Sequence, residues 1–178
     1  MQLIGDDEVI DRLYAKQVEL LEYLISQKQL SYKLDVEYEY KKSLVVSIAS
    51  FFETSIQNMI VEYCNKVSSD DKLLYELVKK KAIDRQYHTY FAWGTPNANQ
   101  FFSHFGKEFK DRLNKEINKN NSLKSGEAAF MYIGSERNKL VHQNFATGGI
   151  EKNINEIFDE YSKGKIFVNF LIKEFGLS

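Results

Sequence analysis

Three polar residues in the second half of the chain could together act on a phosphate ester. They are Arg137, Asn138 and His142. An imidazole can exchange a proton near neutral pH, and a guanidinium binds phosphate through several N–H groups. Asn138 and His142 are four residues apart, so on a helix they lie one above the other and the amide can orient the imidazole. The spacing predicts acid–base catalysis beside a bound anion.

The surroundings of Arg137 strengthen this prediction. On a helix turning by about 100° per residue, Arg137 falls in the middle of an apolar face formed by Phe130, Ile133, Leu140 and Val141. An isolated charge is costly to bury, so an arginine in this position needs a partner. The pattern therefore predicts an acidic group on a neighbouring helix.

Glu53 is the candidate partner, because it is also centred on an apolar stripe. The stripe comprises Val46, Ala49, Ile56, Ile60 and Cys64. Two interpretations remain open. The pair could be an ion pair that only fixes the register of two helices, or it could support a site built from Arg137, Asn138 and His142.

The elements that must position these residues are predicted to be helices, because apolar residues recur every three or four positions through nearly the whole chain. A single proline and nine glycines argue against a sandwich or barrel of many strands. We expect an all-α, single-domain bundle over residues 1–178, with a loop at 93–97. The six expected helices cover about 6–29, 35–67, 68–87, 97–118, 126–145 and 150–175.

Composition narrows the function classes. The 24 Lys and Arg balance 25 Asp and Glu, so nucleic-acid binding would need a local basic patch. One cysteine excludes an internal disulfide, and three histidines show no zinc-ligand spacing, so we expect no metal. The N-terminus is acidic where a signal peptide would be basic, and no stretch approaches the length of a membrane span. We expect a cytoplasmic protein without a membrane partner.

The segment Ser135-Glu136-Arg137-Asn138-Lys139-Leu140-Val141-His142 resembles the R-N-x-x-x-H motif of the HEPN superfamily. The order of elements is similar too: a long early helix with Phe51-Phe52-Glu53, a late helix with the motif, and a last helix after it. The Phe-Phe-Glu triplet and the 93–105 segment are most similar to the RiboL-PSP and MAE_28990 branches. The resemblance implies a HEPN-like all-helical fold.

The resemblance further implies a metal-independent endoribonuclease that needs no cofactor and acts as a homodimer, with two motif helices meeting at a cleft. The 2′-hydroxyl of the RNA would attack the adjacent phosphate and leave a 2′,3′-cyclic phosphate. His142 would serve as general base or acid, Arg137 would stabilise the phosphorane, and Asn138 would orient His142 or the phosphate. The biological setting implied is a toxin, a phage-defence effector or a module associated with RNA repair.

Two further expectations come with the resemblance. An antitoxin or other regulatory partner is implied, but toxins controlled by nucleotidylation carry a tyrosine two residues after the motif histidine, where this chain has Asn144. Control by a nucleotidyltransferase is therefore not expected. The alternative function is a non-catalytic HEPN-like module for dimerisation or for nucleotide or RNA binding.

Overall fold

The computed structural model describes residues 7–68, 71–142 and 148–177, and these residues form an all-helical fold without strands. The predicted fold class is confirmed. Within these residues the elements are α1 (Asp7–Ser26), α2 (Leu30–Val67), α3 (Lys72–Val78), the π-helical segment η1 (Lys79–Ile83), α4 (Tyr87–Tyr90), α5 (Asn99–Ser103), α6 (Lys107–Lys119), α7 (Asn121–His142) and α8 (Ile154–Glu174).

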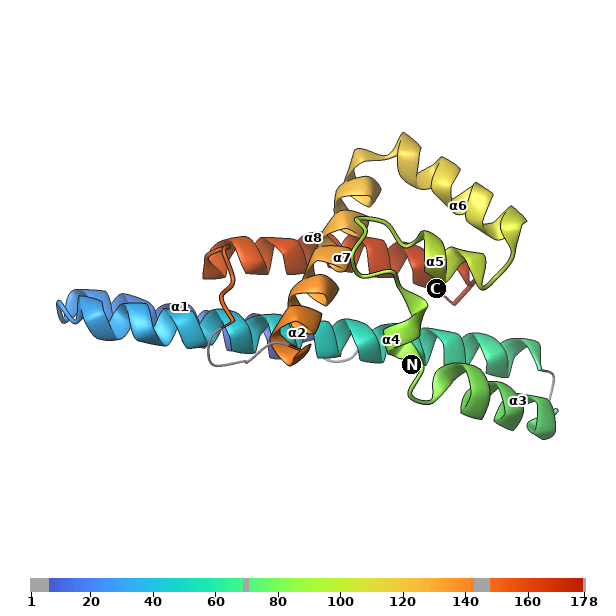
Figure 1. The fold of residues 1–178 in the computed structure, drawn as a ribbon, viewed down its shortest axis with the longest axis horizontal. Helices are drawn as coiled ribbons and strands as arrows, with labels where there is room; N and C mark the ends of the chain where they lie inside the picture. Colours follow the sequence, from blue (N-terminus) through green and yellow to red (C-terminus); the bar gives the residue numbers. More distant parts are fainter. Residues whose placement is uncertain (1–6, 69–70, 143–147, 178) are drawn as a thin grey trace.

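The spine of the fold is α2, whose 38 residues make a helix about 57 Å long. Figure 1 shows α1 lying along the first half of α2, α8 running beside it, and α7 crossing both. Phe130 of α7 marks this crossing, since its ring lies 5.3 Å from Phe52 of α2 and 5.5 Å from Phe167 of α8. These aromatic contacts fix the direction of α7, so they also fix where its C-terminal turn emerges.

Glycines allow α7 and α8 to approach closely. A Cβ on Gly126 of α7 would lie 2.8 Å from the Lys163 carbonyl of α8, and a Cβ on Gly164 would lie 2.6 Å from the Phe52 ring. Neither position has room for a side chain. Gly126 therefore lets the start of α7 pack against the backbone of α8, and Gly164 leaves room on α8 for the Phe52 ring of α2.

The helix over 30–67 begins five residues before its predicted start. Residues 27–29 suffice for the reversal between α1 and α2, because Lys28 takes a left-handed conformation with φ of 58°. A lysine rarely marks such a turn, so the sequence carried no signal for it. The predicted end of this helix at Val67 is confirmed.

Two of the six predicted helices are each divided. The helix predicted over 68–87 becomes α3, η1 and α4, with a break at Arg85, whose φ is 61°. The helix predicted over 97–118 is divided into α5 and α6 at Gly106, whose φ of 94° favours glycine. The turn predicted at 93–97 is confirmed. These divisions explain why there are more helices than the six expected.

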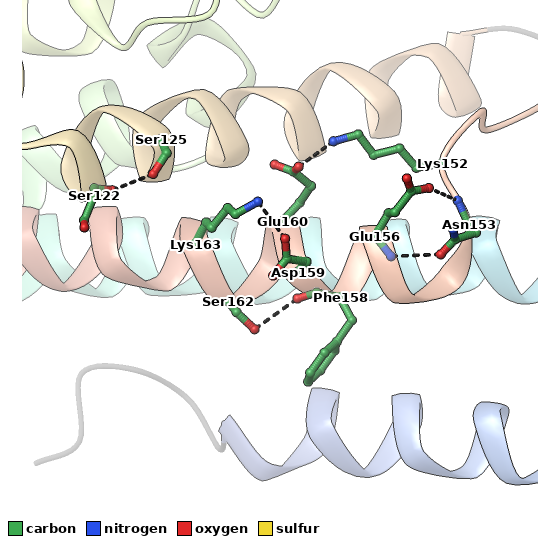
Figure 2. A network of polar contacts seen from close by, with 10 residues as sticks. All are labelled: Ser122, Ser125, Lys152, Asn153, Glu156, Phe158, Asp159, Glu160, Ser162 and Lys163. Carbon is green, nitrogen blue, oxygen red and sulfur yellow. Dashed lines mark hydrogen bonds and ion pairs between the residues drawn. The ribbon is translucent and has the colours of Figure 1, made fainter.

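The last two long helices begin at other residues than predicted. Asn120 accepts hydrogen bonds from the Ser122 and Leu123 amides, so α7 begins at Asn121 rather than Gly126. It is described as far as His142, and its predicted end at 145, like Asn144, lies outside the described residues. Figure 2 shows the capping box of α8, in which Asn153 and Glu156 bond reciprocally and start the helix at Ile154.

One expectation about membranes needs correction. By length and composition α2 is apolar enough to cross a membrane, contrary to the expectation that no stretch approaches the length of a membrane span. Half of its most apolar window is buried inside the fold, and buried core helices of soluble proteins pass the same test. The core role of α2 accounts for its hydropathy.

Candidate active site

The four residues predicted to form the site line one hollow of about 400 Å³ at the C-terminal end of α7. Arg137, Asn138 and His142 come from the last two turns of α7, and Glu53 comes from the middle of α2. The remaining walls are Arg85, Tyr87, His88 and Val141. The crossing of α7 over α2 therefore brings together residues that are more than eighty positions apart in the sequence.

Arg137 is half-buried, which corrects the prediction that it lies in the middle of a buried face. The physical reason is that the last turns of α7 extend beyond the core. Leu140 is still buried at 3% exposure, but Val141 is 56% exposed and His142 is exposed. The apolar face that looks continuous on a helical wheel is thus covered at one end and open at the other.

Glu53 and Arg137 do not form the direct ion pair that their wheel positions suggested: no such pair occurs among the residues described. Instead, both charges act on the hydroxyl of Tyr87. Burial and the negative charge of Glu53 raise the pKa of Tyr87 well above its usual value, and the positive charge of Arg137 partly opposes them. Tyr87 is therefore a neutral phenol that shares the hollow with the two charges.

Asn138 contacts Arg137 rather than the imidazole. The Arg137 Nη1 group donates a hydrogen bond of 3.2 Å to Asn138 Oδ1. This contact uses one of the five guanidinium N–H groups and restrains the orientation of the side chain. In this structure Asn138 orients the group that would bind the anion, which differs from its expected role of orienting His142 or the phosphate.

Arg85, Tyr87 and His88 were not predicted as site residues. Arg85 and Tyr87 belong to the helix expected over 68–87, and His88 follows it; the break at Arg85 turns this segment toward α7. The only sequence signal was the spacing of Arg85 and His88, three residues apart, which carries little weight alone. Their place in the hollow follows from tertiary structure.

Trp93 holds this segment against α7. Its indole Nε1 donates to the His88 carbonyl at 3.3 Å, and its ring lies 4.8 Å from that of Phe91. The opposite edge of the ring packs on Gly134 of α7, where a Cβ would lie only 1.9 Å from Trp93 Cζ3. The absence of a side chain at Gly134 lets the indole lie against α7.

We expect Gly134→Ala to destabilise the protein by about 1–3 kcal/mol, because the added methyl group must displace the indole. The free energy of unfolding, measured by urea denaturation, checks this. Gly94→Ala is the control, since a Cβ there meets nothing within 4 Å. Equal unfolding midpoints for the two variants would show that the Trp93 ring can make room for a methyl group at position 134.

Among the residues that the structure describes, no group of three or more His, Cys, Asp and Glu side chains could hold a metal ion. The hollow itself combines one carboxylate, two arginines and two histidines. Such a set can bind an anion and exchange protons beside it.

The fold and the hollow together define an all-helical domain with an arginine, an asparagine and a histidine on one helix facing a glutamate on its long neighbour. The family model of RiboL-PSP-HEPN matches residues 12–176. The chain therefore belongs to the RiboL-PSP-HEPN family, which confirms the predicted HEPN resemblance. Searches of curated proteins and of solved structures found no significant match.

Proposed function

We propose that the protein is a metal-independent endoribonuclease. The observation that supports the proposal most strongly is that Arg137, Asn138, His142 and Glu53 line a single open hollow. Membership in the HEPN family favours a ribonuclease or a nucleotide-binding module. The combination of a restrained guanidinium and an exposed imidazole favours the ribonuclease, because both groups can act in phosphoryl transfer and neither is fully buried in the core.

In the proposed reaction the 2′-hydroxyl of one ribose attacks the adjacent phosphorus. A bond forms between the 2′-oxygen and phosphorus, and the bond from phosphorus to the 5′-oxygen of the next nucleotide breaks. His142 takes the proton from the 2′-hydroxyl or gives one to the departing 5′-oxygen. Arg137 donates hydrogen bonds to the phosphate oxygens, where negative charge increases in the transition state. The products are a 2′,3′-cyclic phosphate and a 5′-hydroxyl.

Glu53 and Tyr87 act on Arg137 in this proposal. Glu53 shares the hollow with Arg137 without a direct ion pair among the described residues, and the neutral phenol adds no negative charge beside the phosphate. An arginine in a tight ion pair would have fewer N–H groups for a substrate. The open arrangement leaves Arg137 available to the phosphate.

We propose that the active form is a homodimer in the cytoplasm, in which two copies of the hollow form one cleft. One exposed His142 in each copy would then allow one imidazole to act as base while the other acts as acid. The exposed Val141 beside His142 offers apolar surface for such a contact. A toxin or phage-defence effector, or a role in RNA repair, restrained by an antitoxin or other regulatory partner, fits this chemistry.

The test is cleavage of a labelled RNA in excess EDTA, with analysis of the product ends. We expect cleavage to persist without divalent metal and to leave 2′,3′-cyclic phosphate ends, and we expect DNA of the same sequence to remain intact because it lacks the 2′-hydroxyl. Cleavage that stops in EDTA would contradict the proposal. A folded dimer that binds RNA but cuts none would instead favour the non-catalytic module.

A further inference from the structure

A second cavity, of about 470 Å³, lies on the other flank of α7. Its walls come from the loop at 93–96, from α7 and from the segment 149–152. Its volume is within the range of small-molecule pockets in proteins. Since this cavity and the hollow around His142 share no lining residue, it is a separate feature of the surface.

The walls of this cavity include two aromatic side chains. Trp93 and Tyr132 both line it, and both are half-buried. The Lys152 ammonium lies 4.3 Å from the centre of the Tyr132 ring. It also forms an ion pair with Glu160, which Figure 2 shows. These contacts hold the mouth of the cavity in place. Aromatic walls of this kind stack on flat ring systems such as nucleobases.

The polar wall of the cavity offers a hydrogen-bond acceptor. Glu136 is buried, and its Oε1 accepts a hydrogen bond of 2.6 Å from Lys139 Nζ. Among the described residues no donor is bonded to its second oxygen, Oε2. A carboxylate oxygen at the edge of an aromatic cavity can accept from N–H groups of a ligand.

The charged side chains that line the cavity favour a neutral ligand over a phosphate. Two carboxylates, Glu136 and Glu151, and two lysines, Lys139 and Lys152, line it, and both lysines are already paired with glutamates. Burial raises the pKa of Tyr132 above its usual value, and the neighbouring carboxylates add to the shift. With both lysines paired, the lining favours a neutral ligand that offers N–H donors.

Trp93 connects this cavity to the candidate active site. The same indole borders a narrow internal gap that is also lined by Glu53, Arg137 and Asn138. On α7, Lys139 faces the cavity and His142, three residues on, faces the hollow. A nucleotide bound with its phosphate at Arg137 could therefore extend its base, or that of its neighbour, over the side of α7.

We propose that the cavity is a base pocket that binds guanine next to the scissile phosphate. Among the four RNA bases, guanine alone carries two adjacent donors on its edge, N1–H and N2–H₂, which match the Glu136 carboxylate. Its O6 would lie beside these donors and accept from Lys139. The inference rests on the proposed ribonuclease function, because it assigns the sequence preference of that same site.

The test uses the only tryptophan of the chain as a reporter. In ¹⁵N-labelled His142→Ala protein the single indole N–H signal belongs to Trp93. We expect guanosine, which carries no phosphate, to shift this signal saturably, and adenosine, cytidine and uridine to bind at least about tenfold more weakly. Glu136→Gln should weaken guanosine binding by about tenfold or more, because the amide replaces an acceptor with a donor.

The control is Glu108→Gln on α6, an exposed glutamate that does not line the cavity, and it should leave guanosine binding unchanged. No saturable shift with guanosine, equal shifts with all four nucleosides, or unchanged binding in Glu136→Gln would each overturn the base pocket. Because binding is measured without cleavage, a protein that fails to cut RNA can still pass this test. Equal shifts with all four nucleosides, in a protein whose wild type does cut RNA, would overturn the base pocket and leave the ribonuclease proposal standing.

Discussion

RNA cleavage by His142→Ala should fall by about 10²- to 10⁴-fold, which is the range that a general acid or base contributes. His142 is the last described residue of α7 and is exposed, so its side chain contributes little to the core. The unfolding midpoint of the variant should stay within experimental error of the wild type. The measurement is the initial rate of cleavage in EDTA, together with urea denaturation of the same preparation.

His104→Ala is the matched control, since His104 is also exposed but lines a different cavity, between α2 and α5. It should retain full activity. If His142→Ala cleaves RNA at the wild-type rate, the assignment of His142 is wrong, and His88, which lines the same hollow, becomes the next imidazole to replace.

Arg137→Ala should lower cleavage by about 10²- to 10³-fold, the cost of removing one well-placed donor to a developing oxyanion. The loss should be catalytic rather than structural. Arg137 is half-buried, it forms no ion pair among the described residues, and its hydrogen bond to Asn138 is between adjacent side chains. Cleavage rates and unfolding free energies, measured side by side, separate the two effects.

Arg137→Lys refines this prediction, because lysine keeps the charge but lacks the planar fork that binds two phosphate oxygens together. We expect it to recover only part of the lost rate. Arg112→Ala, on the exposed side of α6 and paired with Glu174, is the control and should cleave normally. An unfolded Arg137→Ala protein would contradict the expected non-structural loss. Equal loss of activity in Arg112→Ala would show that Arg137 has no special role at the phosphate.

The helical class and the ends of several helices could be predicted from apolar periodicity and from familiar stop signals. The break at Gly106 was visible as a glycine, although the periodicity around it suggested a continuous helix. The turns at Lys28 and Arg85 could not be predicted, because a left-handed conformation at a long charged side chain is imposed by the packing on either side. Local sequence preferences carry no trace of that packing.

The residues that line the hollow were predicted more accurately than the contacts between them. Arg137, Asn138, His142 and Glu53 do share one space, since opposite charges on two apolar stripes must face a common region. A helical wheel does not show where a helix leaves the core, so it overstated the burial of Arg137. Tyr87 was missed because it reaches the hollow only through the break at Arg85.

The position of the polar residues at the open end of α7 also bears on how such a protein can change through mutation. Phe130 and Leu140 hold α7 in the fold, while His142 lies beyond them at the surface. Substitutions at His142 therefore destabilise the protein less than substitutions at Phe130, so selection for stability removes fewer of them. A single substitution at His142 can therefore change the hollow and leave the scaffold folded.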